Sequence, residues 1–151
     1  MPRNYLVREV MTAPAESLPL DSRLLDAALT LRRTGFRHLP IVDGERLVGI
    51  VTDRDVHRCA PSLLSRVTPE EYNAIFEDTK LERVMTRNPV TVSPDTPLLE
   101  AATILHDRRL GCLPVVEGEK LAGIITVTDM LGVLQDMLSD GDTNPPAKKK
   151  R

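Results

Sequence analysis

One segment of the chain occurs twice, and this duplication sets the strongest limit on the folds that the sequence can form. Val10-Met11-Thr12 reappears 74 residues later as Val84-Met85-Thr86, and Gly49-Ile50 reappears at the same shift as Gly123-Ile124. The match between these segments needs no gap. Self-similarity at a fixed shift is typical of tandem units that share one fold. We therefore expect two copies of one small unit.

Each copy predicts a helix, then two strands, then a second helix. Leu24, Ala28 and Leu31 recur at the spacing of one helix face, and the second copy repeats that spacing. In the second copy, Thr96 and Pro97 are expected to be the N-cap and the first residue of the helix. These patterns place the first helix of each copy directly before its strands.

The strands of the first copy are expected at residues 38–42 and 47–52, joined by a tight turn at Asp43-Gly44. With a short strand before the helix, each copy has the order β-α-β-β-α. A sheet of this size is too small to be stable alone, so the two pseudo-symmetric copies are expected to pack sheet to sheet. The predicted fold class is α/β (α+β). Its core should be aliphatic, because only 3% of the residues are aromatic.

Two segments lie outside the copies. Thr68 and Glu71 have the spacing of a capping box, which predicts a helix through about Phe76 in the linker. The end of the chain is rich in Gly, Pro and Lys, a composition that favours disorder. The expected boundaries are 1–60 for the first repeat with its N-terminal leading segment, 61–81 for a helical linker, 82–138 for the second repeat and 139–151 for a disordered basic tail.

Charge and cysteine content disfavour several classes of protein. The formal net charge is −2 and the last four residues are all basic, so residues 1–147 carry a charge of −6. An acidic body repels a phosphate backbone, so nucleic acid is not an expected partner. Cys59 and Cys112 form no CxxC pair and have no histidine beside them, which disfavours a disulfide framework or a zinc site.

The expected location is the cytoplasm. Two isolated cysteines fit a reducing compartment. The first residues lack the apolar run of a secretory signal, and no stretch approaches the roughly 18 consecutive apolar residues that a membrane span needs. We therefore expect a soluble protein with no membrane partner.

Both copies place Thr at the end of a strand and Asp three residues later, at the start of a helix. The pairs are Thr52 with Asp55 and Thr126 with Asp129. Two interpretations fit. Thr-x-x-Asp is typical of a capping box, which needs no ligand. The same turn also exposes backbone donors and the positive end of a helix, where a phosphate is stabilised, and its carboxylate can accept hydrogen bonds from ribose hydroxyls.

Neighbouring residues extend the second interpretation. Gly49 and Gly123 allow a backbone or a flat ring to approach closely. Ile50 and Ile124 offer an apolar wall to a base. The phosphate, the sugar and the base of a nucleotide would each find a partner at such a turn.

These residues carry a family resemblance. The repeated Leu-Pro-(Ile/Val)-Val, followed by Gly-Ile-(Val/Ile)-Thr-x-x-Asp, resembles the cystathionine-β-synthase (CBS) domain. The two copies resemble a CBS pair, or Bateman module, over about residues 5–138. The insert that runs through residues 58–62 is similar to that of stand-alone bacterial CBS-pair proteins of the acetoin-utilisation type. The resemblance implies two clefts that bind adenosyl ligands, and a homodimer.

The family's binding positions are carried over by alignment. In each cleft the Thr and Asp of the turn would hold the ribose, an isoleucine would lie against the adenine, and three more residues stand where such modules often bind phosphate. The positions are Thr52, Asp55, Ile50, Arg37, His38 and Arg54 in the first cleft, and Thr126, Asp129, Ile124, Gly111, Cys112 and Thr128 in the second.

The two clefts differ in charge on the phosphate side. Only the first has cationic groups there, so it is expected to bind phosphorylated ligands more tightly. Other interpretations stay open for single residues. Arg37 and His38 also fit an exposed basic patch after a helix, and Cys112 is more typical of a small core residue than of a nucleophile.

The leading hypothesis is a regulatory module that senses adenine nucleotides such as AMP, ADP or ATP and signals to an unknown protein effector through a conformational change. The family also includes binders of S-adenosylmethionine and NAD. The alternative is a structural or interaction protein whose clefts are unoccupied or filled by side chains. An enzyme is not expected, because no nucleophile, base and orienting group can be assembled. No metal or cofactor is expected either.

Overall fold

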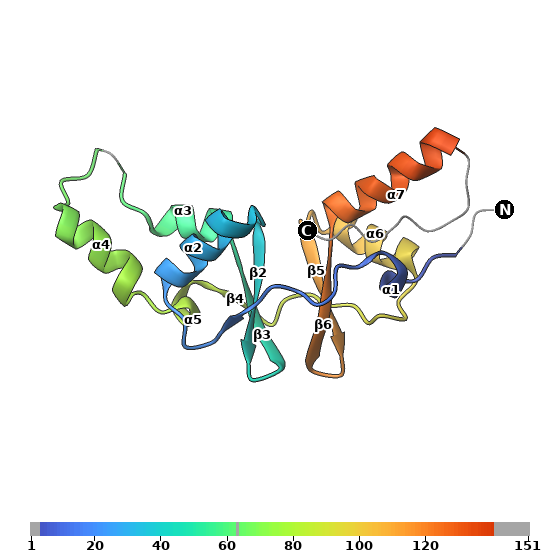
Figure 1. Ribbon diagram of the computed structural model, residues 1–151, viewed down its shortest axis with the longest axis horizontal. Coiled ribbons are helices and arrows are strands. Elements are labelled where there is room, and N and C mark those ends of the chain that lie inside the picture. Colours follow the sequence, from blue (N-terminus) through green and yellow to red (C-terminus); the bar gives the residue numbers. More distant parts are fainter. Residues whose placement is uncertain (1–3, 63, 141–151) are drawn as a thin grey trace. The chain divides into compact units, whose positions relative to one another are not determined.

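The computed structural model describes residues 4–62 and 64–140, which form two compact units (Figure 1). The central unit comprises residues 16–89. The terminal unit joins residues from both ends of the described chain, 4–15 and 90–140. Each unit has its own cluster of buried apolar side chains.

The central unit contains a small mixed sheet and four helices. Its elements are β1 (Leu18–Pro19), α2 (Leu24–Thr34), β2 (His38–Asp43), β3 (Arg46–Thr52), α3 (Asp53–Cys59), α4 (Pro69–Asp78), α5 (Leu81–Val84) and β4 (Thr86–Arg87). β1 runs parallel to β2, and β3 pairs antiparallel with both β2 and β4.

The terminal unit contains a β-hairpin and three helices. Its elements are α1 (Val7–Val10), α6 (Leu98–Asp107), β5 (Cys112–Glu117), β6 (Lys120–Thr126) and α7 (Val127–Asp140). β5 and β6 pair antiparallel. Val92 forms a parallel bridge with Val115, and Thr12 forms an antiparallel bridge with Ile124. Together the units confirm the predicted α/β class and the helix, hairpin, helix order of each copy.

The two units are built to the same plan. At a shift of 74 residues, α5 is the equivalent of α1, α6 of α2, the β5-β6 hairpin of the β2-β3 hairpin, and α7 of α3. The bridge of Val92 with Val115 takes the place of β1 on β2, where Leu18 pairs with Ile41. The duplication seen in the sequence is therefore a duplication of backbone structure.

The leading segment of each copy packs in the unit of the other copy. These leading segments are residues 4–15 in the first copy and residues 81–87, which form α5 and β4, in the second. Thr12 lies near the start of the first copy but exchanges two hydrogen bonds with Ile124 of the second copy, with N···O distances of 2.9 and 3.0 Å. Likewise Thr86 lies near the start of the second copy and pairs with Ile50 of the first copy. The compact units therefore differ from the sequence repeats: residues 4–15 belong with the second copy, and α5 and β4 belong with the first.

Both cores are mainly aliphatic, as the composition predicts, and the terminal core also contains Tyr5. In the central unit Leu24, Leu39, Ile41 and Val51 are fully buried. Burying one such side chain contributes roughly 1.5–3 kcal/mol. The buried stripe of α2 runs through Ala27 rather than Ala28, which is half-buried. Leu24 is buried as expected and Leu31 packs against the core, so of the three predicted positions Ala28 alone departs from the expected face.

Two helix starts were predicted from caps, with different outcomes. Thr68 caps α4 as predicted, because its hydroxyl oxygen accepts from the amide of Glu71 at 3.1 Å. The cap predicted at Thr96 is wrong. α6 begins one residue later with Pro97 as its N-cap, and the Thr96 hydroxyl instead accepts from the amide of Ser93 at 2.9 Å.

The first hairpin turn and the end of the chain also differ from expectation. Asp43 still pairs with Arg46, so the hairpin loop is residues 44–45 rather than Asp43-Gly44. Gly44 has a φ of 64°, which the left-handed turn requires. Residues 139 and 140 are the last residues of α7, not part of a tail, and the basic run lies outside the described residues. Within residues 4–62 and 64–140 no helix has the length and apolarity to cross a membrane.

Candidate functional site

The turn from β3 into α3 is closed by a reciprocal capping box. The amide of Thr52 donates to Oδ2 of Asp55 at 2.8 Å, and the amide of Asp55 donates to Oγ1 of Thr52 at 3.3 Å. The Asp55 side chain is 17% exposed, and its Oδ1 lies 3.9 Å from Nη1 of Arg58, whose side chain is 77% exposed. The cap therefore engages one carboxylate oxygen, and the other makes a long ion pair with an exposed arginine.

The turn from β6 into α7 has the same arrangement. The amide of Thr126 donates to Oδ2 of Asp129 at 2.9 Å, and the amide of Asp129 donates to Oγ1 of Thr126 at 3.2 Å. The Thr126 hydroxyl also donates to Oδ2 of Asp129 at 3.0 Å. The capping interpretation of both Thr-x-x-Asp pairs is therefore confirmed in the structure.

A backbone hydrogen bond ties each turn to the start of the preceding hairpin. In the central unit the amide of Asp53 donates to the carbonyl of Arg37 at 3.0 Å, and His38 pairs directly with Thr52. In the terminal unit the amide of Val127 donates to the carbonyl of Gly111 at 3.0 Å. The carried-over phosphate positions therefore lie beside the helix start in both units.

The cations of the central turn are open to solvent. Arg37 and Arg54 are both exposed, and their guanidinium groups have no ion pair or hydrogen bond to another described residue. Two positive charges beside the positive end of a helix attract an anion. The equivalent residues of the terminal turn, Gly111 and Thr128, are exposed and uncharged.

Burial excludes the thiol of the terminal turn from chemistry at neutral pH. Cys112 pairs with Thr126 in the hairpin and is 8% exposed. Burial raises the pKa of the Cys112 thiol from 9.0 to about 12. A thiol is a nucleophile only as the thiolate, so Cys112 acts as a small core residue.

The glycines before the isoleucines accommodate a neighbouring backbone. A Cβ on Gly49 would lie 2.9 Å from the carbonyl oxygen of Thr86, and one on Gly123 would lie 2.7 Å from that of Thr12. The backbone that approaches is that of the leading segment. Ile50 and Ile124 are 8% and 7% exposed, so each offers little apolar surface at its turn.

The repeated Met-Thr motif lies against the glycines just before these turns. No site role was predicted for it from the sequence. Met85 and Thr86 lie over Gly49, and the sulfur of Met85 is the nearest atom to the position of a Cβ there, at 2.5 Å. Thr12 has the equivalent place at Gly123. The sequence feature that could have identified these residues as part of the site is the exact repetition of Met-Thr at the 74-residue shift.

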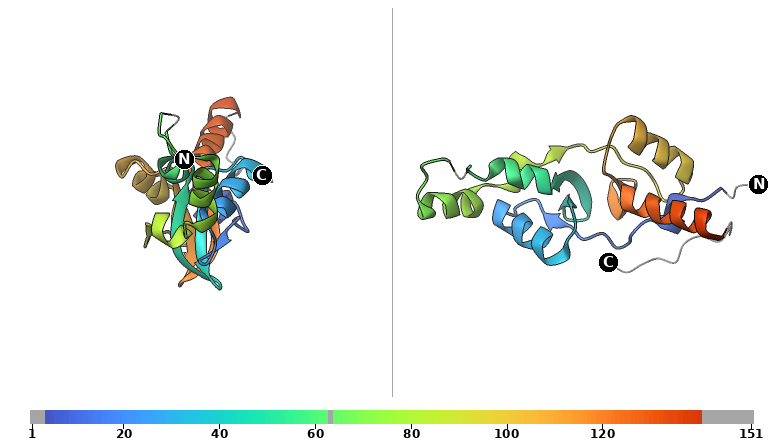
Figure 2. Two further views of the ribbon diagram at one scale, coloured as in Figure 1. Left: turned by 90° about the vertical axis from the view of Figure 1, so that its left-hand side faces the viewer. Right: turned by 90° about the horizontal axis from the view of Figure 1, so that it is seen from above.

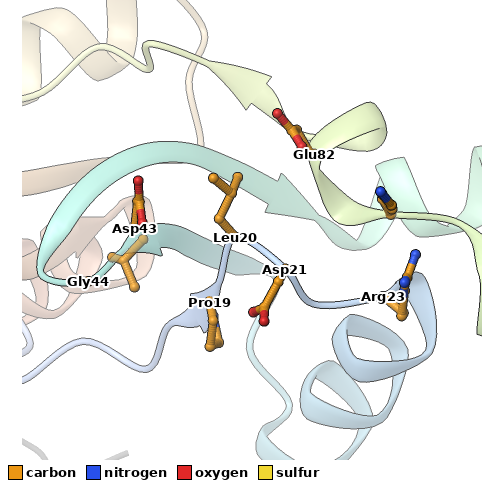
Figure 3. Close-up of a pocket in the computed structure, with 9 residues that line it drawn as sticks. Pro19, Leu20, Asp21, Arg23, Asp43, Gly44 and Glu82 are labelled. Carbon is orange, nitrogen blue, oxygen red and sulfur yellow. The ribbon is translucent and has the colours of Figure 1, made fainter.

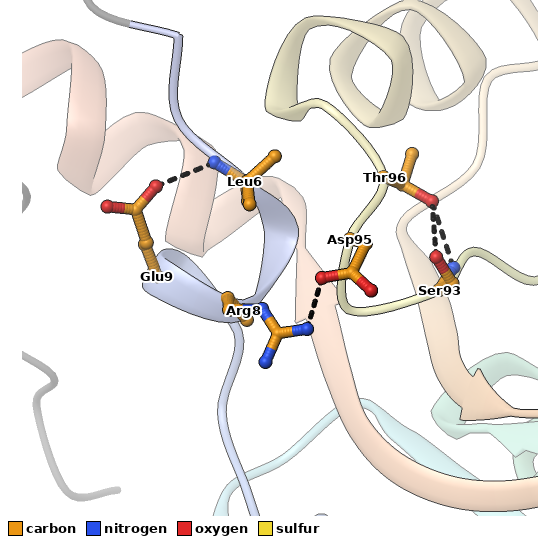
Figure 4. Close-up of polar contacts among 6 residues, drawn as sticks. All are labelled: Leu6, Arg8, Glu9, Ser93, Asp95 and Thr96. Atoms are coloured by element: carbon orange, nitrogen blue, oxygen red, sulfur yellow. Dashed lines mark hydrogen bonds and ion pairs between the residues drawn. The ribbon is translucent and has the colours of Figure 1, made fainter.

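The two copies also differ at one ion pair away from the turns. In the terminal unit Arg8 pairs with Asp95 (Figure 4). The equivalent residues of the central unit, Glu82 and Asp21, are both acidic and line a cavity of about 500 Å³ (Figure 3). The remaining lining residues are Pro19, Leu20, Arg23, Val42, Asp43, Gly44 and Lys80. None of the carried-over binding residues lines this cavity, so it is separate from the candidate site.

The fold and the duplicated turns define a tandem CBS-domain protein. The CBS domain family matches the chain twice, over residues 7–61 and 81–136, and the chain belongs to this family. It is similar to a CBS domain-containing protein of Dictyostelium discoideum, with 31% identity over 135 residues that cover 88% of this chain and 93% of the relative. Other relatives are longer, and the matched part is 45% and 13% of two of them.

Solved structures show the same fold. A Vibrio cholerae protein described as an acetoin utilization protein superposes with a TM-score of 0.78, at 31% identity, over 95% of this chain and all of that one. Two further structures each have a TM-score of 0.73 and 26% identity, and cover 89% of this chain and 98% of theirs. One is CBSX2 in complex with AMP. The other is the CBS domain pair of MJ0100 in complex with 5-methylthioadenosine and S-adenosyl-L-methionine.

Proposed function

We propose that this chain is a regulatory module that binds an adenine nucleotide of the AMP, ADP or ATP type at its two strand-to-helix turns and signals that binding to a protein partner. The proposal rests on one observation above all: the same turn, with a carboxylate held at the start of a helix, is built twice. Relatives with this fold are known in complex with AMP and with S-adenosyl-L-methionine.

Each part of the ligand has a proposed partner at the central turn. The exposed guanidinium groups of Arg37 and Arg54 would bind the phosphate, and Oδ1 of Asp55, the oxygen that the cap does not engage, would accept from ribose hydroxyls. Capping and ligand binding do not compete, because the cap engages the other carboxylate oxygen. The absence of cations at Gly111 and Thr128 supports weaker binding of phosphorylated ligands at the terminal turn.

The role proposed for the chain is regulatory rather than catalytic. Binding energy at a helix start can bias the population of one conformation of a module over another, and a partner that contacts only one conformation then reads the bound state. No step of bond making or breaking is proposed at either turn.

Calorimetric titration with AMP tests the proposal. Asp55→Asn keeps a capping oxygen but removes the charge, so it is expected to weaken binding of AMP with little loss of folding stability. Asp129→Asn is the matched variant of the other turn and should have the smaller effect. An equal loss from both variants would contradict the asymmetry. No binding of AMP, ADP, ATP or S-adenosylmethionine to the wild type would contradict the nucleotide proposal itself.

A second candidate function is an interaction protein that binds no nucleotide. The completed capping boxes and the burial of Ile50 and Ile124 favour it, since both account for the motif without a ligand. It predicts no thermal stabilisation by any adenosyl compound, whereas the first candidate predicts stabilisation that grows with ligand concentration.

A further inference from the structure

The cavity beside the β2-β3 hairpin takes no part in the proposed nucleotide site. Its volume is about 500 Å³, within the range of roughly 300–1,000 Å³ that is usual for small-molecule sites. Its lining comes from the end of β1, the start of α2, the hairpin turn and the start of α5, all in the central unit. The hairpin turn lies at the opposite end of β2 and β3 from the start of α3 (Figure 2).

The lining combines acidic and basic side chains, but the opposite charges do not pair with each other across the cavity. Glu82 pairs instead with Arg87, at 3.2 Å. Nη1 of Arg23 donates to the backbone carbonyl of Asp78 at 3.4 Å, which is a long hydrogen bond to an uncharged group. One acid is therefore neutralised outside the cavity, and the one internal contact of Arg23 leaves its charge uncompensated.

The remaining charged groups of the lining are balanced in sign. Asp21, Asp43 and Lys80 line the cavity, and their side chains have no hydrogen bond or ion pair to any other residue within 4–62 and 64–140. With Arg23, these residues provide two carboxylates and two cations. A ligand that carries one charge of each sign would satisfy both kinds of group.

The charges are separated along the cavity. Arg23 and Lys80 form an antiparallel backbone bridge, so both cations are at the same end. Figure 3 shows Asp43 at the opposite end of the lining from Arg23, with Leu20 between them in the view. Leu20 and Val42 are half-buried and provide an apolar wall. The cavity therefore has a basic end, an acidic end and an apolar middle.

The second copy shows that the duplicated fold does not require the basic end. At the 74-residue shift, Pro97 and Leu6 take the places of Arg23 and Lys80, so the terminal unit has neither cation there. Its own cation, Arg8, already pairs with an aspartate of the same unit (Figure 4). The terminal unit thus compensates its charge internally, and the central unit leaves opposite charges open to a ligand.

We propose that this cavity binds a small zwitterion whose ammonium and carboxylate groups are separated by an apolar middle, such as a dipeptide of apolar residues with free termini. Asp21 and Asp43 would bind the ammonium group, and Arg23 and Lys80 would bind the carboxylate. The apolar side chains of the ligand would lie against Leu20. A simple anion or cation fits less well, because the group of like charge at one end would repel it.

The expected affinity is low. Asp21, Asp43 and Lys80 are exposed, and an ion pair at an exposed site contributes little. The dissociation constant is expected to be roughly 0.1–1 mM. The inference is independent of nucleotide binding, since none of the residues assigned to the nucleotide lines the cavity.

Thermal-shift assays and calorimetric titration of the full chain with leucyl-leucine, valyl-valine and alanyl-phenylalanine test the proposal. At least one dipeptide is expected to bind and to stabilise the wild type as its concentration rises. The absence of binding by all three would overturn the proposal.

Blocked forms of the dipeptide that binds test its two charges. The N-acetyl form lacks the ammonium group and the amide form lacks the carboxylate, so each is expected to bind roughly tenfold more weakly. A single amino acid has both charges on one carbon and is also expected to bind more weakly, because it cannot reach both ends. Undiminished binding by any of these compounds would contradict recognition of two separated charges.

Variants at the two ends assign the binding to the cavity. Asp43→Asn and Lys80→Gln keep the size of the side chain and remove its charge, so each should weaken binding roughly threefold and the double variant roughly tenfold. Glu77→Gln and Arg83→Gln are the matched controls, since both residues are exposed in the same unit but lie outside the lining. They should leave the affinity unchanged. Stabilisation that persists undiminished in the double variant would be a general solute effect and would overturn the proposal.

Discussion

Thr52 and Asp55 hold each other at the start of α3, each donating its backbone amide to the side chain of the other, at 2.8 and 3.3 Å. Thr126 and Asp129 repeat this exchange at the start of α7. One local motif therefore serves the stability of the helix and provides the carboxylate that the proposed function needs. Substitutions at these positions must separate the two roles.

The capping role predicts a loss of stability without ligand. Asp55→Ala removes the acceptor for the Thr52 amide and should lower the free energy of unfolding by about 1 kcal/mol. Asp55→Asn retains an acceptor oxygen and should lose less. Urea denaturation of the apo protein measures both. Equal losses from Ala and Asn would show that charge, rather than the hydrogen bond, stabilises the helix start.

The proposed phosphate contacts predict a difference between AMP and adenosine. Arg37→Ala and Arg54→Ala should each weaken AMP binding roughly tenfold, which corresponds to one charge-assisted hydrogen bond. Adenosine has no phosphate, so its affinity should not change. Arg32→Ala, at an exposed arginine of α2, is the control. A similar loss for adenosine would argue against phosphate contacts at these residues.

The close approach of the leading segments predicts that two glycines tolerate no side chain. Gly123→Ala would place its Cβ 2.7 Å from the carbonyl oxygen of Thr12, and the backbone there is held by two hydrogen bonds to Ile124. The variant should lose roughly 1–3 kcal/mol of stability in urea denaturation.

Gly132 provides the contrast for that prediction. It lies within α7, and apart from the adjacent backbone of that helix no described atom lies within 4 Å of the position of its Cβ. Gly132→Ala should raise stability by about 0.5–1 kcal/mol, because alanine restricts the unfolded chain and favours helix. A loss from this variant would indicate a neighbour at the outer side of α7.

The buried thiol predicts a dependence of stability on alkaline pH. Burial raises the pKa of Cys112 from 9.0 to about 12. The folded state therefore keeps its proton where the unfolded chain loses it, so stability is full below pH 9 and falls as pH rises toward 12. Cys112→Ala should remove this part of the alkaline loss. Urea denaturation of both proteins at pH 8 and pH 10.5 gives the comparison.

Sequence patterns among neighbouring residues predicted much of the fold. The hairpins, the cap at Thr68 and the two Thr-x-x-Asp turns each depend on residues close together in the chain, and each was confirmed. The cap at Thr96 failed for a local reason as well. Ser93 offers a competing amide donor to the same hydroxyl, and Pro97 takes the cap position itself.

The exchange of the leading segments was not predictable from local patterns. Met11-Thr12 and Met85-Thr86 are the same dipeptide, so either could pair with Gly49 or Gly123 without any change in local sequence. For this reason the contacts of the two Met-Thr segments beside the turns were not predicted. The Thr and Asp residues of the turns were correctly placed at helix starts.

The bridge between Thr12 and Ile124 joins residues about 110 positions apart, with the whole central unit lying between them in the chain. During synthesis the ribosome completes residues 16–89 before Ile124, the partner of Thr12, exists. The central unit can therefore fold while the protein is still being made, whereas the backbone at Thr12 must wait for β6 to emerge. The order of translation thus makes the terminal unit the later of the two to mature.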